Sequence, residues 1–207
     1  MSIATLSLVI GTHNIAKGRE LADLLAPHGF RVETLQEVGD SLEVVEDGDT
    51  FATNARKKSV EQAIHLKSWV LADDSGLEVD ALGAAPGVYS ARFGGEDASD
   101  AENNLKLLDE LAGIPINQRG ARYYCHVAVA DPTGEIRAES SAICRGRIRC
   151  KSAGEGGFGY DPLFEIVEYH RTFGELGRRV KAALSHRARA MRAIVPQLVD
   201  LSRGGTW

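Results

Sequence analysis

The chain has 207 residues, a net charge of −5 and three cysteines. A chain of this length buries roughly 70% of its unfolded surface, so it needs neither disulfides nor a structural metal to fold. Cys125, Cys144 and Cys150 lack C-x-x-C spacing, which argues against a zinc cluster and favours reduced thiols. No apolar run approaches the ~20 residues that span a bilayer, and MSIATLSLVI carries no basic n-region. We therefore expect one soluble, cytoplasmic domain over residues 1–207.

Hydrophobic periodicity predicts alternating strands and helices in the first half of the chain. The predicted strands are Thr5–Ile10 and Trp69–Ala72, and the predicted helices are Lys17–Leu25 and Phe51–Lys67. Asp49 or Thr50 would cap the second helix, whose apolar stripe would contain Phe51, Ala55, Ala63 and Ile64.

In the second half, a capping box, a hairpin and a glycine-rich loop can be recognised. Ser99 and Glu102 form the capping box ahead of a helix with Leu105, Leu108 and Leu111 on one face. Residues 121–131 alternate as a strand, and a turn at 131–134 leads to a second strand through Ile143–Ile148. The loop 152–161 follows, and Ser185 can cap a last helix with its apolar face at Met191, Ile194, Leu198 and Leu201. This order predicts an α/β fold with a mixed central β-sheet flanked by helices.

The first loop, GTHNIAK, joins a buried strand to a helix that begins near Asn14. Free backbone N–H groups at the helix N-terminus and the charge of Lys17 would hold a phosphate well. The loop matches neither the Walker pattern nor the dinucleotide pattern GxGxxG. An ordinary turn capped by Asn14 is the alternative.

Asp73 and Asp74 follow the buried strand 69–72 and precede Ser75 and Gly76. Adjacent side chains of an extended chain point to opposite faces, so one carboxylate would serve a cation and base chemistry while the other orients it. Mg²⁺ suits such a sparse site, with a second carboxylate from the acidic segment 33–49. An Asx-type turn made with Ser75 would explain the same residues without a metal.

Two further features suggest a nucleotide. Phe158, between glycines in GGFGYD, offers a flat face for a base, and Asp161 can accept a hydrogen bond from a ring N–H. Lys181, His186 and Arg187 lie at the start of a helix, where cations are unfavourable unless an anion or a carbonyl oxygen is bound. The alternatives are a surface turn with Phe158 in the core and a solvated basic patch.

The strings THNIAKGREL, TFATNA, LADDSGLEVDAL with APGVYSARF, GGFGYDPLF and KAALSHRARA, in this order, resemble the inosine triphosphate pyrophosphatase family. The resemblance covers nearly the whole chain, and it implies two lobes with a nucleotide cleft between them. It implies a Mg²⁺-dependent homodimer that hydrolyses non-standard purine nucleoside triphosphates (ITP, dITP, XTP) to the monophosphate and pyrophosphate, and so cleanses the nucleotide pool. The nearest alternative is a house-cleaning pyrophosphatase of the Maf type, and another is a non-catalytic nucleotide-binding protein. The acidic chain argues against nucleic-acid binding.

The resemblance also implies roles for individual residues. Asp74 would be the proton acceptor, supported by Asp73, and Glu46 and Asp74 would hold Mg²⁺. Val45 and Thr53 depart from the family's usual EE and ENA, which leaves Glu43 and Asp47 as alternatives to Glu46. The residues that would contact substrate are Thr12, His13, Asn14, Ile15, Ala16, Lys17, Lys58, Ser75, Arg92, Phe158, Gly159, Tyr160, Asp161, Lys181, His186 and Arg187.

Overall fold

The computed structural model describes residues 7–204 and 207. Its strands are β1 (Ser7–Ile10), β2 (Arg31–Thr34), β3 (Val70–Val79), β4 (Gly120–Ala130), β5 (Ile136–Ile148), β6 (Phe164–Ile166) and β7 (Arg171–Thr172). Its α-helices are α1 (Ile15–Leu25), α2 (Leu35–Val38), α3 (Phe51–Leu66), α4 (Asp100–Glu110), α5 (Arg178–Leu184) and α6 (His186–Arg203). Thr5 and Leu6 of the predicted first strand lie outside the described residues.

The strands of the described residues form one sheet in the order β2-β1-β3-β4-β5-β6-β7. β1 pairs in parallel with both β2 and β3, whereas β6 pairs antiparallel with both β5 and β7. The α/β fold with a mixed sheet is therefore confirmed. No helix within these residues is long and apolar enough to cross a membrane.

The chain divides into two compact units. Unit 1 contains the described residues up to Asp74, Cys125–Ala142 and the described residues from Arg187. Unit 2 contains Ser75–Tyr124 and Ile143–His186. The strands β3, β4 and β5 each contribute residues to both units. The nucleotide cleft expected between two lobes stays a prediction.

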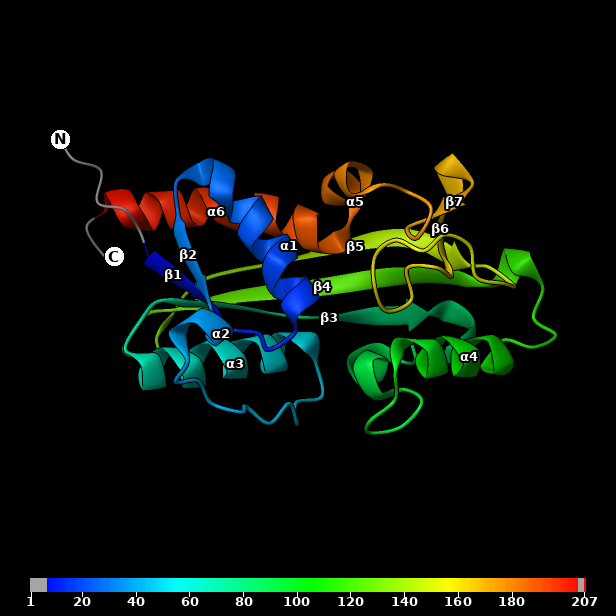
Figure 1. The fold of residues 1–207 in the computed structure, drawn as a ribbon, viewed down its shortest axis with the longest axis horizontal. Coiled ribbons are helices and arrows are strands. Elements are labelled where there is room, and N and C mark those ends of the chain that lie inside the picture. The colour runs from blue at the N-terminus through cyan, green and yellow to red at the C-terminus, as the bar shows by residue number, and fades with distance from the viewer. Residues whose placement is uncertain (1–6, 205–206) are drawn as a thin grey trace. The chain divides into compact units, whose positions relative to one another are not determined.

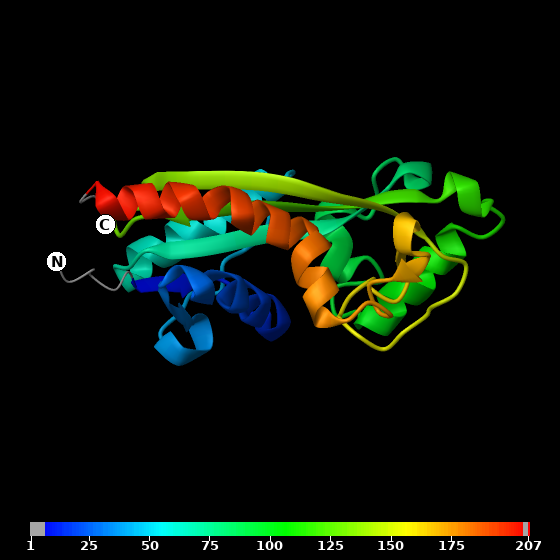
Figure 2. The same cartoon turned by 90° about the horizontal axis from the view of Figure 1, so that it is seen from above.

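In unit 1, α3 covers one face of the strands, and α1 and α6 cover the other (Figure 1). Strand alternation explains this, because Leu8 and Ile10 pack with α1 and α6 while Val9 packs with α3. Figure 2 shows α6 running alongside the unit 1 part of β5. There, Ser140 Oγ donates a hydrogen bond of 2.9 Å to the carbonyl of Ala190.

In unit 2, α4 packs through Leu107 and Leu111 into a core that includes Leu77 of β3 and Tyr123 of β4. The predicted capping box of Ser99 and Glu102 is confirmed. Of the predicted face, Leu111 is buried and Leu108 packs against the core, but Leu105 is 67% exposed and Leu107 is buried instead. Successive four-residue steps from Asn103, rather than three-residue steps between leucines, define the buried stripe.

Three other expectations were wrong. Ile64 of α3 is 52% exposed and does not join the apolar stripe. Lys181 belongs to a separate short helix, α5, and only His186 and Arg187 begin α6. The strand predicted to end at Ala72 continues to Val79, since Leu77 and Val79 extend its buried alternation past Gly76.

Candidate functional site

The predicted site residues fall into two sets, one in each unit. Unit 1 holds the loop Thr12–Lys17 with Glu46, Lys58, Asp73, Asp74 and Arg187. Unit 2 holds Ser75, Arg92, Phe158–Asp161, Lys181 and His186. Each set is described within its own unit.

The loop ahead of α1 has the geometry expected from its sequence. Asn14 is the N-cap, and its Oδ1 accepts a hydrogen bond of 3.0 Å from the Lys17 backbone N–H. Thr12 Oγ1 accepts from the Asn14 N–H at 3.2 Å. His13 is fixed at 2.9 Å from Leu42 O, while Ile15 is exposed and Ala16 is half-buried. The half-buried side chain of Lys17 belongs to the first turn of α1, where the backbone N–H groups of the helix N-terminus also lie.

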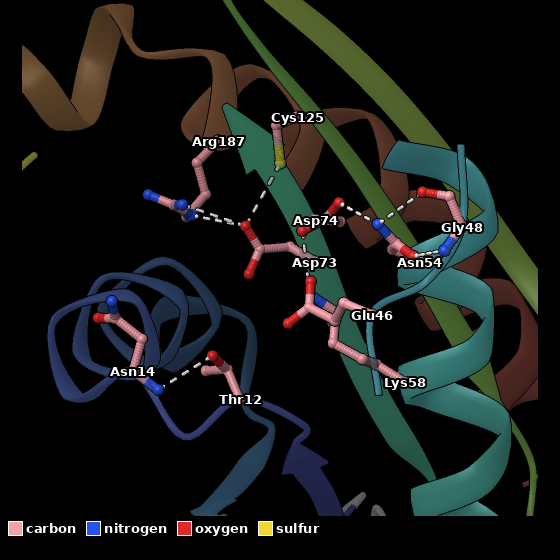
Figure 3. A network of polar contacts seen from close by, with 10 residues as sticks. All are labelled: Thr12, Asn14, Glu46, Gly48, Asn54, Lys58, Asp73, Asp74, Cys125 and Arg187. Carbon is pink, nitrogen blue, oxygen red and sulfur yellow. Dashed lines mark hydrogen bonds and ion pairs between the residues drawn. The ribbon is translucent and has the colours of Figure 1, made fainter. Parts of the chain in front are cut away.

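Asp74 and Glu46 converge on one ammonium group (Figure 3). Lys58 Nζ lies 2.8 Å from Glu46 Oε2 and 3.1 Å from Asp74 Oδ1. The two alternatives for Glu46 point elsewhere, since Asp47 pairs with Lys57 at 2.6 Å and the nearest basic partner of Glu43 is His13 at 3.9 Å. Glu46 is therefore the acidic-segment carboxylate that the structure brings to Asp74.

Asn54 hydrogen-bonds both to Asp74 and to the backbone of the acidic segment that carries Glu46. Its Nδ2 donates to Asp74 Oδ2 at 3.3 Å, and its Oδ1 accepts from the Gly48 N–H at 2.8 Å. Asn54 and Lys58 are four residues apart on α3, so they share the helix face that meets Asp74. The acidic segment is thereby attached to α3 at Gly48, two residues after Glu46.

The electrostatic environment differentiates the two carboxylates. Burial raises the pKa of Asp74, and the neighbouring Glu46 adds to this effect against the opposing charges of Lys58 and Lys17. Burial alone would also raise the pKa of Glu46, but the charge and hydrogen bond of Lys58 outweigh it and lower that pKa. Asp74 is therefore the more basic of the two, which suits a proton acceptor.

Asp73 faces a different set of partners. Because Asp73 and Asp74 lie within a continuous strand, their side chains point to opposite faces, and the alternative of an Asx-type turn with Ser75 is wrong. Arg187 Nε and Nη2 each lie 3.1 Å from Asp73 Oδ2, and Arg187 Nη1 lies 2.5 Å from Glu20 Oε2. Burial opposes ionisation of Asp73, but the charge of Arg187 outweighs it and holds the pKa far below its usual range.

Asp73 also has a buried thiol beside it. Cys125 Sγ lies 3.8 Å from Asp73 Oδ2, and burial together with this carboxylate raises the pKa of the thiol well above its usual range. Cys125 is therefore a neutral packing group. Asp73 Oδ1 is buried and has no hydrogen-bond partner among the described residues. Figure 3 shows this oxygen turned away from Arg187.

The residues of unit 1 fit a sparse Mg²⁺ site. Within the described residues, no group of three His, Cys, Asp or Glu side chains is arranged to hold a metal ion. Two carboxylates do converge on a single cation, the ammonium of Lys58. Mg²⁺ is typically held by one or two carboxylates together with substrate phosphates and waters, so the donor set is sufficient.

In unit 2, the glycine-rich loop is fixed by Asp161. Its Oδ2 accepts from the Phe158 N–H at 2.9 Å and from Lys181 Nζ at 2.7 Å. Lys181 Nζ also lies 4.4 Å from the centroid of the Phe158 ring. Gly157 has φ +78°, and a Cβ there would meet Asp161 Oδ2 at 2.0 Å, so only glycine fits. Phe158 is half-buried, and it is Tyr160 that enters the core.

The remaining predicted residues of unit 2 are built into the core or its edge. His186 stacks on Tyr123 with ring centroids 4.6 Å apart. Lys181, His186 and Arg187 are all buried, so the alternative of a solvated basic patch is wrong. Arg92 lies over the Tyr89 ring at 5.2 Å, and Ser75 is half-buried within β3.

Sequence reasoning missed Asn54 and Glu20. Asn54 precedes Lys58 by four residues, and Glu20 follows Lys17 by three, which places each pair on one helix face. A polar residue at that spacing from a predicted site lysine is the signal that could have identified them.

Comparisons with known proteins identify the family. A model of the Ham1 family matches residues 8–197. The chain is 54% identical over 194 residues to a Rhodopirellula baltica protein named dITP/XTP pyrophosphatase, with 94% of this chain and 93% of the relative covered. A Desulforamulus reducens protein of the same name is 50% identical over 187 residues, with 90% and 92% covered. The chain belongs to the Ham1 family, and the resemblance found in its sequence is confirmed.

Solved structures agree with this assignment. A HAM1 protein from Coxiella burnetii superposes with a TM-score of 0.85 at 32% identity, covering 95% of this chain and all of that one. A protein from Mycobacterium abscessus described as a nucleoside-triphosphatase and dITP/XTP pyrophosphatase gives 0.73 at 39% identity, with 91% and 98% covered.

The buried Asp73–Arg187 pair makes a prediction about stability. Arg187→Met should lower the free energy of unfolding by about 3–5 kcal/mol, because it leaves the Asp73 carboxylate buried without its main cation. Urea denaturation followed by circular dichroism measures this change. Lys57→Met, which breaks the exposed pair with Asp47, is the control and should change stability little. Equal effects of the two substitutions would contradict the role of the buried pair.

Proposed function

We propose that this protein hydrolyses the purine nucleoside triphosphates dITP, XTP and ITP to the monophosphate and pyrophosphate. The observation that carries the proposal is the convergence of Glu46 and Asp74 on one cation, the ammonium of Lys58. The membership of the Ham1 family and the names of the close relatives support the same activity. A cytoplasmic location is a proposal that rests on the cysteine pattern, and a homodimer is a proposal that rests on the sequence resemblance.

Triphosphate binding is assigned to the loop ahead of α1 and to two lysines. The N–H groups at the α1 N-terminus and the positive end of its dipole attract phosphate oxygens. Lys17 contributes a full charge, and this charge acts on Asp73, Asp74 and Glu46. Lys58 is the second phosphate cation once it leaves the carboxylates. The two lysines would neutralise charge on the leaving pyrophosphate.

Glu46 and Asp74 would hold Mg²⁺, which when bound supplies charge neutralisation at the phosphate oxygens. Asp74 accepts the proton of the water that attacks the α-phosphorus, and its raised pKa improves it as a base. Asn54 keeps the Asp74 carboxylate oriented through Oδ2. Arg187 keeps Asp73 ionised on the opposite face of the strand. The bond that breaks joins the α-phosphorus to the bridging oxygen, so pyrophosphate leaves intact.

Selectivity for the base is assigned to Phe158, Asp161 and His186. Hypoxanthine and xanthine present an acceptor oxygen at position 6, where adenine presents an amino donor. The donor of His186 would pair with that oxygen and would face another donor in adenine, whereas Arg187, expected from the sequence to share this role, is engaged by Asp73 and Glu20. A buried donor left without its partner costs about 1–3 kcal/mol, which is sufficient for discrimination of about tenfold to several hundredfold.

For the proposed reaction, the first prediction concerns the general base, Asp74. Asp74→Asn should lower kcat for dITP by about 10²–10⁴-fold, because an amide accepts a proton far less readily while retaining the shape of the side chain. The assay incubates the protein with Mg²⁺ and dITP and measures pyrophosphate separately from orthophosphate. Turnover within tenfold of the wild type would contradict the assignment of Asp74. Orthophosphate as the primary product of the wild type would contradict the proposed bond cleavage.

The second prediction concerns competition between Lys58 and the metal. Lys58→Met should strengthen Mn²⁺ binding in the absence of nucleotide by about tenfold, since the ammonium no longer neutralises Glu46 and Asp74. The same substitution should raise the KM for dITP, because a phosphate contact is lost. Electron paramagnetic resonance titration measures free Mn²⁺. Lys57→Met on the same helix is the control, and Mn²⁺ binding that is unchanged or weaker in Lys58→Met would refute the competition.

The third prediction concerns substrate choice. The wild type should have a kcat/KM for dITP and XTP about tenfold to several hundredfold above that for dATP. A panel of triphosphates assayed for pyrophosphate release provides the comparison. Equal values for dITP and dATP would refute the selectivity assigned to the position 6 oxygen.

A further inference from the structure

The backbone N–H and the carbonyl of Gly159 are both held by one helix face. Its N–H donates to Asp100 Oδ2 at 2.6 Å, and its carbonyl accepts from Asn104 Nδ2 at 2.9 Å. Asp100 and Asn104 are four residues apart on α4, so their side chains lie one above the other on the helix surface. Together they form a clip on the residue that follows Phe158.

The clip acts at a glycine between Phe158 and Tyr160. Gly157 and Gly159 both have positive φ, at +78° and +60°, and neither has a side chain that could pack. Hydrogen bonds fix the backbone of Phe158 instead, and its carbonyl accepts from the Asp161 N–H at 3.3 Å. Asp161 Oδ2 holds its N–H on one side, and the clip holds the next residue on the other.

Neither residue of the clip is required to cap α4. Ser99 and Glu102 already form the capping box, with Ser99 Oγ accepting from the Glu102 N–H. The amide of Asn104 also carries a cost, because its Oδ1 is buried without a hydrogen-bond partner among the described residues. A buried acceptor without a partner destabilises a fold, so an apolar side chain would favour folding at this position. The hydrogen bond from the Asn104 amide to the Gly159 carbonyl therefore explains why an amide stands at this position.

We propose that Asp100 and Asn104 are positioning residues for purine recognition, which hold the Phe158 ring at the orientation a base requires. The inference rests on the proposed nucleotide site and extends it to α4, to which the sequence assigned no functional residue. Both side chains of the clip hydrogen-bond to the loop that carries Phe158, which is separate in the sequence from the phosphate-binding loop Thr12–Lys17. Loss of the clip should therefore weaken binding of the base and leave binding of pyrophosphate unchanged.

The test compares Asp100→Ala with Asp100→Asn. Both variants lose the charge, but the amide oxygen of Asn can still accept from the Gly159 N–H. Inhibition of dITP hydrolysis by dIMP, which carries the base, and by pyrophosphate, which does not, reports the two parts of the site separately. Asp100→Ala should raise the inhibition constant of dIMP and the KM for dITP by about tenfold, with kcat and the pyrophosphate constant within about twofold. Asp100→Asn should remain close to the wild type.

Amide exchange of Gly159, followed by NMR, provides a readout that does not depend on activity. Exchange should accelerate in Asp100→Ala and stay slow in Asp100→Asn, and Asn104→Ala should repeat the dIMP effect through the carbonyl side. Asp109→Ala, an exposed carboxylate of the same helix, is the control and should change none of these quantities.

Three outcomes would overturn the positioning role. These are an unchanged dIMP constant in Asp100→Ala, an equal rise in the pyrophosphate constant, and failure of Asp100→Asn to restore binding. A wild type that releases no pyrophosphate from dITP would instead overturn the proposed function, and the positioning role with it. The two failures are therefore distinguished by the wild-type assay alone.

Discussion

Two carboxylates buried side by side in β3 are the constraint on which unit 1 depends. Asp73 and Asp74 are 0% and 5% exposed, and burial disfavours the charged form of each. The fold supplies Arg187 to one face of the strand and Lys58 to the other, while the charge of Lys17 acts on both carboxylates. The helices α1, α3 and α6 each contribute at least one of these cations. The packing of three helices around the strand is thus tied to the charge balance at its centre.

The sequence was sufficient for most of the fold because its patterns were local. The N-caps Asn14 and Thr50, the Ser99–Glu102 box and the 121–148 hairpin each depend on residues close in the chain, and all are confirmed. The errors occurred where a local pattern was ambiguous. Ser75 and Gly76 indicate a turn when taken alone, but the strand continues because Leu77 and Val79 bury their side chains beyond them.

Partners that are distant in the sequence could not be predicted in the same way. Asp73 and Arg187 are separated by 114 positions, and no periodicity relates them. The chain fold alone brings them together. Glu20 and Asn54 differ from this pair, because their helical spacing from Lys17 and Lys58 was a local signal, but the groups they bond are again distant in the sequence. The resemblance favoured Glu46 but left Glu43 and Asp47 as alternatives, because the three carboxylates lie within five positions of one segment. The structure brings Glu46 to the ammonium that Asp74 also contacts.

Strand alternation places a lasting ion pair of Asp73 with Arg187 on one side of β3 and an exchangeable ion pair of Asp74 with Lys58 on the other. A guanidinium stays charged at any ordinary pH and donates from several nitrogens in a fixed plane, so Arg187 suits a lasting contact with both Asp73 and Glu20. An ammonium on a flexible stem is a point charge that can change partners, and Lys58 has this property beside Asp74 and Glu46. If the two residue types were exchanged, the side of β3 that carries Asp74 would hold an arginine, which changes partners less readily. The side that carries Asp73 would hold a lysine, whose more strongly hydrated ammonium costs more free energy to bury. The assignment of arginine to Asp73 and lysine to Asp74 therefore follows from the different tasks of two adjacent residues.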